Sequence, residues 1–263
     1  MSIEIPKDHP RYESLTMRER LIEGMHGKVV APAGLIAHGR GEAFDYLLEE
    51  KTHPFAENAI EASAALFLLS KHPVISVNGN VASLCPEQLV ELSEAIPAPL
   101  EINLFYRTPG REEAIYKTLR KAGAEKVLGT LDSAQTTIPE LGSERRIVDP
   151  NGIAKADTVF VPLEDGDRTK ALISMGKNVI TVDLNPLSRT SQKASITIVD
   201  NIIRAIRLLI NDITRLKTTD IAELEKITSQ YSNIKTLKRA KICIADYLTG
   251  LDSKGKELKY GEK

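Results

Sequence analysis

Four short apolar runs, each followed by polar residues, constrain the fold of this chain more than any other feature. They cover residues 74–77, 100–105, 158–161 and 179–182. Continuous apolar runs of this kind are typical of strands buried on both faces, as in a parallel sheet covered by helices. In such sheets, ligands bind at the carboxyl ends of the strands, near a switch in strand order. Because Asp, Glu, Asn and Arg follow these runs, the sequence predicts a site for a charged, phosphorylated substrate.

Helical patterns alternate with these strands. We expect helices at 11–27, 56–71, 86–95, 111–122 and 167–175, and further strands at 126–129 and 195–199. Segment 33–48 has the composition of a loop in its first half and of a helix in its second. Asp167 is the expected N-cap of the helix that follows it. The alternation predicts βαβ units, and therefore an α/β fold with a mostly parallel sheet and helices on both faces.

The C-terminal part of the chain has a helical pattern alone. Apolar residues at 202, 203, 206, 209 and 210 mark one amphipathic helix, and residues 213–249 form two more that join near Ser232. The last stretch, 251–263, is polar and rich in lysine, so we expect it to fray. These patterns predict a catalytic domain over 1–212, with an N-terminal helical segment, and a helical C-terminal appendage over 213–263.

Composition excludes several classes of protein. The chain has 263 residues, 27% of them charged, and a net charge of −1, which does not indicate a nucleic-acid or membrane partner. The N-terminus lacks the apolar core of a signal peptide, and the longest uncharged apolar run, 62–69, is far shorter than the roughly 18 residues of a membrane span. Cys85 and Cys243 lie outside any CxxC pattern. We therefore expect a cytoplasmic protein without a disulfide framework.

Asp183, at the end of a predicted strand, has two interpretations. It either bonds a ribose hydroxyl, as in dinucleotide-binding folds, or caps the turn that follows. The glycine-rich phosphate fingerprint that should precede such a residue by about 20 positions is absent. Donors nevertheless follow at Asn185, Ser188, Arg189 and Thr190, and they suit purine, ribose and phosphate oxygens.

The segment Gly39–Glu42 is a second candidate contact for phosphate. If it opens a helix, its small residues let backbone N–H groups approach an anion, and Arg40 adds a charge-assisted contact. The alternative is an ordinary turn at a helix start. His38 is either a proton shuttle or phosphate ligand, or a structural hydrogen-bond donor.

The segment 164–168 places three acids and one arginine at a strand end. Carboxylates this close repel one another unless a cation or a ligand ammonium offsets their charge, so the segment either holds Mg²⁺ with substrate phosphates or forms a solvated turn and helix cap. Polar residues also interrupt or follow two buried strands, at Asn78, Asn80, Glu101 and Asn103. A glutamate in an apolar strand needs a partner, and Glu101 and Asn103 point the same way, toward a polar site.

Several long segments together resemble one family. They are GLIAHGRGEAFDYL, HPVISVNGNVASL, LEINLFYRT, VPLEDGDRT and VITVDLNPLSRT, supported by IPKDHPRYESL and ITIVDNIIRA. These resemble the archaeal phosphopantothenate synthetases, the 4-phosphopantoate–β-alanine ligases of coenzyme A biosynthesis, over residues 3–212. The resemblance implies a cytoplasmic homodimer with a Rossmann-like core. It also implies that ATP, 4-phosphopantoate and β-alanine are converted to 4′-phosphopantothenate, AMP and diphosphate through a phosphopantoyl-adenylate.

The resemblance also implies a set of site residues. The ATP contacts are Arg18, Arg40, Asp183, Leu184, Asn185, Arg189, Thr190, Asn201 and Ile202, with Arg20 as an alternative to Arg18. From position and chemistry, His38, Arg40, Glu164 and Asp165 are the catalytic candidates, and Glu164, Asp165 and Asp167 hold either Mg²⁺ or the β-alanine ammonium. The acyl pocket is assigned to Asn78, Asn80, Asn103 and Tyr106, and the 4-phosphate to Arg107 and Arg168, with Arg145, Arg146 and the 78–80 loop as the next candidates.

Two other functions compete with this one. A nucleotide-dependent oxidoreductase would bind NAD(P)H, but the missing glycine fingerprint argues against it. A non-catalytic nucleotide-binding regulator would not need polar clusters at several strand ends.

Overall fold

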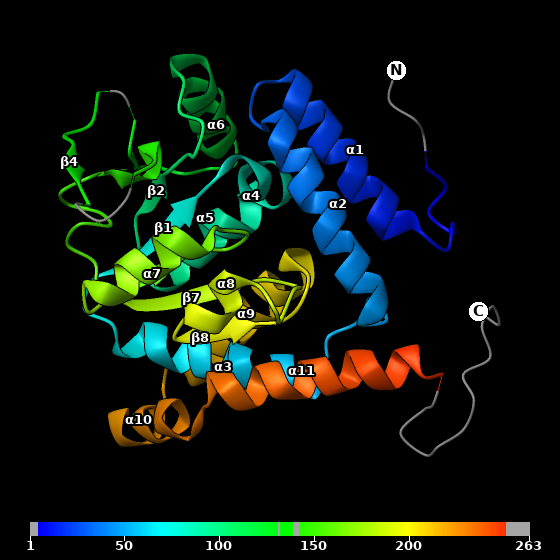
Figure 1. Ribbon diagram of the computed structural model, residues 1–263. Helices are drawn as coiled ribbons and strands as arrows, with labels where there is room; N and C mark the ends of the chain where they lie inside the picture. The colour runs from blue at the N-terminus through cyan, green and yellow to red at the C-terminus, as the bar shows by residue number, and fades with distance from the viewer. Residues whose placement is uncertain (1–4, 131, 139–141, 251–263) are drawn as a thin grey trace.

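A six-stranded parallel sheet forms the centre of the computed structural model, which describes residues 5–130, 132–138 and 142–250 (Figure 1). The strand order is β3-β2-β1-β6-β7-β8, so the order reverses between β1 and β6. The strands are β1 (Pro73–Val77), β2 (Leu100–Ile102), β3 (Val127–Leu128), β6 (Thr158–Phe160), β7 (Asn178–Val182) and β8 (Ile196–Ile198). The predicted Rossmann-like α/β class is confirmed.

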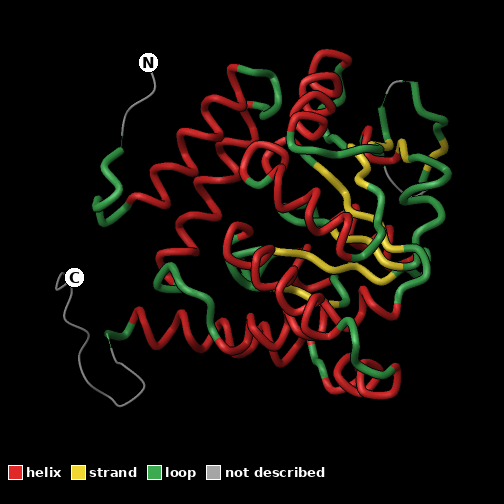
Figure 2. The backbone as a smooth tube through the Cα atoms, turned by 180° about the vertical axis from the view of Figure 1, so that it is seen from behind, coloured by secondary structure: helices red, strands yellow, loops and turns green. Residues whose placement is uncertain are grey.

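The sheet buries a different core on each face because successive side chains of a strand point to opposite sides. Ile75 and Val77 face a core shared with α3, α5, α6 and α9, whereas Val74 faces a smaller core that includes α7. Figure 2 shows the molecule from behind, with helices around the strands. The helices named here are α3 (Pro54–Leu69), α5 (Pro86–Ala95), α6 (Pro109–Lys121), α7 (Gly166–Ser174) and α9 (Ile202–Leu216). The continuous apolar runs of the sequence are explained by this two-sided burial.

The N-terminal segment adds two adjacent helices, α1 (Tyr12–His26) and α2 (Pro32–Leu47), beside the short helix α4 (Gly79–Leu84) that follows β1 (Figure 1). The prediction of a loop over the first half of 33–48 is wrong, since α2 runs through it. Pro32 stands at the first turn, where its missing N–H costs nothing. Gly34 is needed for packing: a Cβ there would lie 2.3 Å from Asn80 Oδ1 of α4.

Three local predictions need correction. Asp165, not Asp167, caps α7, because its side chain accepts the Arg168 N–H at 2.9 Å. Two short helices were not predicted: α4, capped by Asn78, and α8 (Arg189–Lys193), capped by Ser188. The run 100–105 leaves the strand conformation after Ile102.

The C-terminal helices pack onto the core. α9 continues to Leu216, so the predicted boundary at residue 212 falls inside a helix. α10 (Ile221–Gln230) packs on α3, and α11 (Asn233–Leu248) contacts α3, α8, β8 and α2. A small antiparallel pair, β4 (Thr136–Thr137) and β5 (Ile147–Val148), lies outside the main sheet. Across the described residues, no helix combines the length and the apolar character needed to cross a membrane. The stretch 251–263 lies outside those residues.

Candidate functional site

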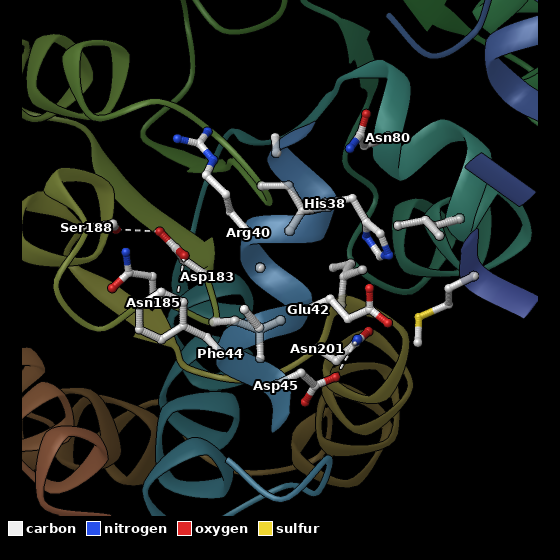
Figure 3. A pocket seen from close by; sticks show the side chains of 18 of the residues that line it. His38, Arg40, Glu42, Phe44, Asp45, Asn80, Asp183, Asn185, Ser188 and Asn201 are labelled. Atoms are coloured by element: carbon white, nitrogen blue, oxygen red, sulfur yellow. Dashed lines mark hydrogen bonds between the residues drawn. The ribbon is translucent and has the colours of Figure 1, made fainter. Parts of the chain in front are cut away.

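A cavity of about 510 Å³, the main cavity, opens between α2 and the loops at the carboxyl ends of four strands. Its walls come from α2, from α4 after β1, from the 163–164 loop after β6, from the turn 183–190 after β7, and from Asn201 and Ile202 after β8. Figure 3 shows side chains from these elements around the cavity. Since strand order reverses between β1 and β6, the cavity lies where this fold class binds ligands.

The main cavity brings together many of the residues that the sequence singled out. Those that line it are His38, Arg40, Asn80, Glu164, Asp183, Leu184, Asn185, Thr190, Asn201 and Ile202. Segments that are far apart in the chain therefore line one cavity, as the polar residues at the strand ends predicted.

The turn after β7 is organised by Asp183. Its Oδ1 accepts the Asn185 N–H at 2.9 Å and its Oδ2 accepts the Ser188 hydroxyl (Figure 3). Burial raises the pKa of the Asp183 carboxyl, although the bonds from Ser188 and Asn185 oppose the shift. Asp183 thus caps its turn and also lines the cavity, so the two interpretations of this residue do not exclude each other.

One face of α2 forms a wall of the cavity, with His38, Gly41, Glu42 and Asp45 at helical spacing. Among the described residues, His38 Nε2 is buried without a hydrogen-bond partner. Burial lowers the pKa of His38, and Glu42 opposes this, so the imidazole is neutral at pH 7. In the tautomer that carries its proton on Nδ1, Nε2 can accept a proton.

The expected phosphate contact of Gly39–Glu42 through backbone N–H groups is wrong. These residues lie within α2, where amide groups bond to the preceding turn. Neither glycine is required by close packing. A Cβ at Gly39 would meet nothing within 4 Å, and one at Gly41 would reach Leu184 at 3.8 Å. Arg40 itself lines the cavity (Figure 3).

Arg18 and Arg20 differ in their partners. Arg18 Nη2 donates to Glu42 Oε1 at 2.7 Å, and Glu42 also accepts from the Tyr46 hydroxyl at 2.8 Å. Arg20 instead donates to the Leu84 carbonyl at 3.0 Å. Leu84 and Glu42 both line the cavity, so each arginine contacts a cavity residue; Arg18 bonds a side-chain carboxylate there, whereas Arg20 bonds only a backbone carbonyl.

Asn78 joins the two strands at the switch in strand order. Its Nδ2 donates to the carbonyls of Pro162 at 2.9 Å and Leu163 at 3.2 Å, while its Oδ1 caps α4. Leu163 has a left-handed backbone, with φ 53°, which is uncommon for a non-glycine residue. Asn78 thus has a structural role, holding β1 to the loop after β6.

The acidic segment after β6 is neutralised by arginines. Glu164 is buried between Arg145 and Arg168. The Asp165 carboxylate lies 3.1 Å from the Arg145 guanidinium, and Asp167 pairs with Arg189 at the surface. These carboxylates do not fit a magnesium site, because each already faces an arginine.

Within the described residues, the acidic, histidine and cysteine side chains close enough to share a metal ion are Glu49, His53 and Cys243. The two ring nitrogens of His53 lie 3.7 and 3.6 Å from Cys243 Sγ, so neither lone pair points at the sulfur. The His53 ring also stacks on Phe55. None of the three residues lines the main cavity, and the group is a packing contact beside α3 and α11.

A family model for phosphopantothenate/pantothenate synthetase matches residues 55–247. The chain belongs to this family. It is 55% identical to the 4-phosphopantoate–β-alanine ligase of Thermococcus kodakarensis over 96% of this chain and 97% of that protein. Identity to the ligase of the same name from Thermococcus onnurineus is 53%, over 96% and 97% of the two chains. For the Methanosarcina mazei ligase it is 47%, over 93% and 96%.

Two arginines that the sequence assigned to the 4-phosphate are occupied by internal partners in this synthetase family member. Arg107 pairs with Glu112 and donates to the Gly129 carbonyl at 3.0 Å. Arg168 is fully buried, with Nη1 donating to Ser76 Oγ at 2.9 Å and to Glu164. The structure does not bring them together around one cavity, because each faces a different carboxylate inside the protein.

Other predicted acyl-pocket residues divide between the interior and the surface. Asn103 is fully buried and donates to the carbonyls of Arg145 at 3.1 Å and Ile147 at 3.0 Å. Tyr106 is more than half exposed, beside a second cavity. Glu101 finds the partners that a buried carboxylate needs, accepting the N–H groups of Asp149 and Ile153.

Sequence reasoning missed the base of the main cavity. Asp45, buried in α2, accepts from Asn201 Nδ2 at 2.9 Å and pairs with Arg204, which also bonds Asp200. The sequence could have indicated Asp45 as a cavity residue, because it lies seven residues after His38 and therefore on the same helix face. Its partner Arg204 is far away in sequence and could not be inferred.

Proposed function

We propose that this protein is an ATP-dependent ligase that joins 4-phosphopantoate to β-alanine, as a step of coenzyme A biosynthesis. The observation that carries the proposal is the 55% identity, over nearly the whole of both chains, to a relative with that name. The main cavity supports it, since its volume of about 510 Å³ lies within the range of roughly 300–1,000 Å³ typical of small-molecule sites. Its lining combines apolar surface with polar side chains such as Asp183, Asn185 and Asn201, which suits a nucleotide.

The reaction needs an activated carboxylate. The phosphopantoate carboxylate attacks the α-phosphorus of ATP, diphosphate leaves, and an acyl-adenylate forms; the amine of β-alanine then attacks the acyl carbon and AMP leaves. We assign Asp183, Asn185 and Asn201 to the nucleoside and Arg40 to the triphosphate, and the assignment is supported by their common place in the lining of the main cavity. Preorganised cations of this kind stabilise the negative charge that accumulates in both steps.

His38 is suited to the second step. The amine of β-alanine is protonated in solution and must lose a proton before or during its attack. The imidazole is neutral because burial lowers its pKa, and its Nε2 has no partner among the described residues. We assign it the role of general base.

The remaining assignments are narrower than the sequence suggested. Because each of the three acids already faces an arginine, neither Mg²⁺ nor the β-alanine ammonium is assigned to them, although Glu164 lines the main cavity. Mg²⁺ as a companion of ATP, a homodimer and a cytoplasmic location are also part of the proposal; the homodimer rests on the family resemblance, and the location on the composition of the chain.

The test is the product of ATP turnover with each substrate omitted in turn. AMP and diphosphate should form only when 4-phosphopantoate is present, and 4′-phosphopantothenate only when β-alanine is added. ADP and orthophosphate would instead indicate an acyl-phosphate route. Nucleotide binding without turnover would favour a regulator, and binding of NAD(P)H in a fluorescence titration would favour an oxidoreductase.

A further inference from the structure

A second cavity, the small cavity, adjoins the main one. Its volume is about 260 Å³, and the two share Ala37, Asn80 and Leu163 as lining residues. The charged side chains that line the small cavity are Arg111, Arg145 and Asp165. Two guanidinium groups therefore face it against one carboxylate, so its lining has a net positive charge.

Arg145 is held rigidly at the small cavity. Its side chain is 10% exposed and contacts Glu164, Asp165 and the Phe105 ring, whose centroid lies 6.0 Å from the guanidinium carbon. Burial and the neighbouring Arg168 lower the pKa of Arg145 to about 9, although Asp165 opposes this. Glu164 and Asp165 both face Arg145, so the charge that remains to be offset at the small cavity is that of Arg111, and an anion bound between the two arginines would offset it.

Arg111 approaches the small cavity from α6. Its two terminal nitrogens donate to the backbone carbonyls of Tyr106 and Val29, the latter at 3.0 Å, which leaves its own positive charge without a carboxylate partner among the described residues. Its Nε is buried and has no hydrogen-bond partner in the described part of the chain. Gly79 makes room for it, since a Cβ there would lie 2.8 Å from Arg111 Nη2.

We propose that the small cavity is an anion subsite, in which Arg111 and Arg145 bind the phosphate monoester of the acid substrate. The inference rests on the proposed function for the identity of that substrate, and it replaces Arg107 and Arg168 in this role. Bound there, the substrate directs its phosphate toward Arg111 and its carboxylate across the shared wall, at Asn80, into the main cavity. The subsite therefore sets both the specificity and the orientation of the acid.

The test compares Arg111→Gln and Arg145→Gln with a matched control, Arg120→Gln. Arg120 lies on the same helix and also donates to two backbone carbonyls, those of Ala124 and Glu125, but it lines neither cavity. The ratio of kcat/KM for 4-phosphopantoate to kcat/KM for pantoate should fall by about 10- to 100-fold in each subsite variant, the size of one lost charge-assisted contact. The ratio should stay at the wild-type value in Arg120→Gln, and the Kd for ATP should change little in all three.

Failure of the subsite and failure of the proposed function give different results. A wild-type protein that makes AMP, with an unchanged ratio in both subsite variants, would overturn the subsite alone. A wild-type protein that makes no AMP would overturn the proposed function, and calorimetric titration with inorganic phosphate then decides on the subsite. Phosphate binding weakened by Arg111→Gln and restored in part by Arg111→Lys supports it, whereas equal binding in wild type and Arg111→Gln refutes it.

Discussion

At the scale of single residues, several buried charged side chains pair with one another inside the protein. Glu164 and Arg168 form a buried pair, and Arg107 and Glu112 another. Buried pairs of this kind cost desolvation and satisfy each other, so they do not bind ligands readily. His38, with its unpartnered buried nitrogen among the described residues, is the contrasting case.

The role of His38 predicts a pH dependence. Because its pKa lies below the usual 6.5, the imidazole is neutral above that range and becomes protonated as pH falls. The kcat/KM for β-alanine should therefore be constant near neutral pH and fall on the acid side. In His38→Gln this acid limb should vanish and the rate should drop by about 100- to 10,000-fold. A variant that keeps the acid limb would show that another group titrates.

At the scale of secondary-structure elements, α2 positions the site, because one face forms a wall of the main cavity while another packs on α4. Two glycines of α2, Gly34 and Gly39, differ in their surroundings. Gly34 lies against Asn80, which donates from Nδ2 to the Gly34 carbonyl at 2.9 Å, whereas Gly39 faces open space. Gly34 is therefore required by the packing of α2 on α4, whereas Gly39 is not required by any close contact.

This division predicts opposite effects of the same substitution. Gly34→Ala should destabilise the protein by about 1–3 kcal/mol, because the new methyl group displaces Asn80. Gly39→Ala meets no neighbour within 4 Å and should stabilise the helix by up to about 1 kcal/mol. Thermal or urea unfolding of the two variants measures both effects. Equal destabilisation by both would show that α2 tolerates no added side chain at all.

At the scale of the whole molecule, helices cover both faces of the six-stranded sheet, and the C-terminal helices pack on it through α3 and, for α11, also through β8. Much of this was predictable: the four apolar runs became central strands, and the polar residues after them reached one edge. The two-sided burial of a parallel sheet leaves a continuous pattern that can be read without knowing the partners.

What could not be predicted depends on pairing between distant segments. The small cavity needs Arg111 from α6 and Arg145 from the segment before β5, and no local pattern brings these together. Arg107 and Arg168 looked equally suitable, because a sequence does not show which arginines line either of the two cavities and which face carboxylates without lining them. The first half of helix α2 was mistaken for a loop for a related reason: α4, a segment distant in sequence, packs against Gly34.

The C-terminal stretch provides a test at the same scale. Residues 251–263 are polar and rich in Lys, Gly and Glu, so burial could not offset the entropy of ordering them. Their deletion should leave the melting temperature and kcat/KM close to the wild-type values. A loss of activity, or a changed mass in solution by light scattering, would show that this stretch is needed for assembly.

Leu163 constrains how the sequence can vary through evolution. Its backbone is left-handed, its carbonyl accepts from Asn78, and it lines both cavities. Val, Ile and Thr disfavour that conformation strongly, while Gly and Asn adopt it but remove the apolar side chain between the two cavities. Few residue types satisfy both demands, so drift at this position should be confined mainly to unbranched or γ-branched apolar residues. Changing the acid that such an enzyme accepts is then easier at the arginines of the small cavity than at the wall between the cavities.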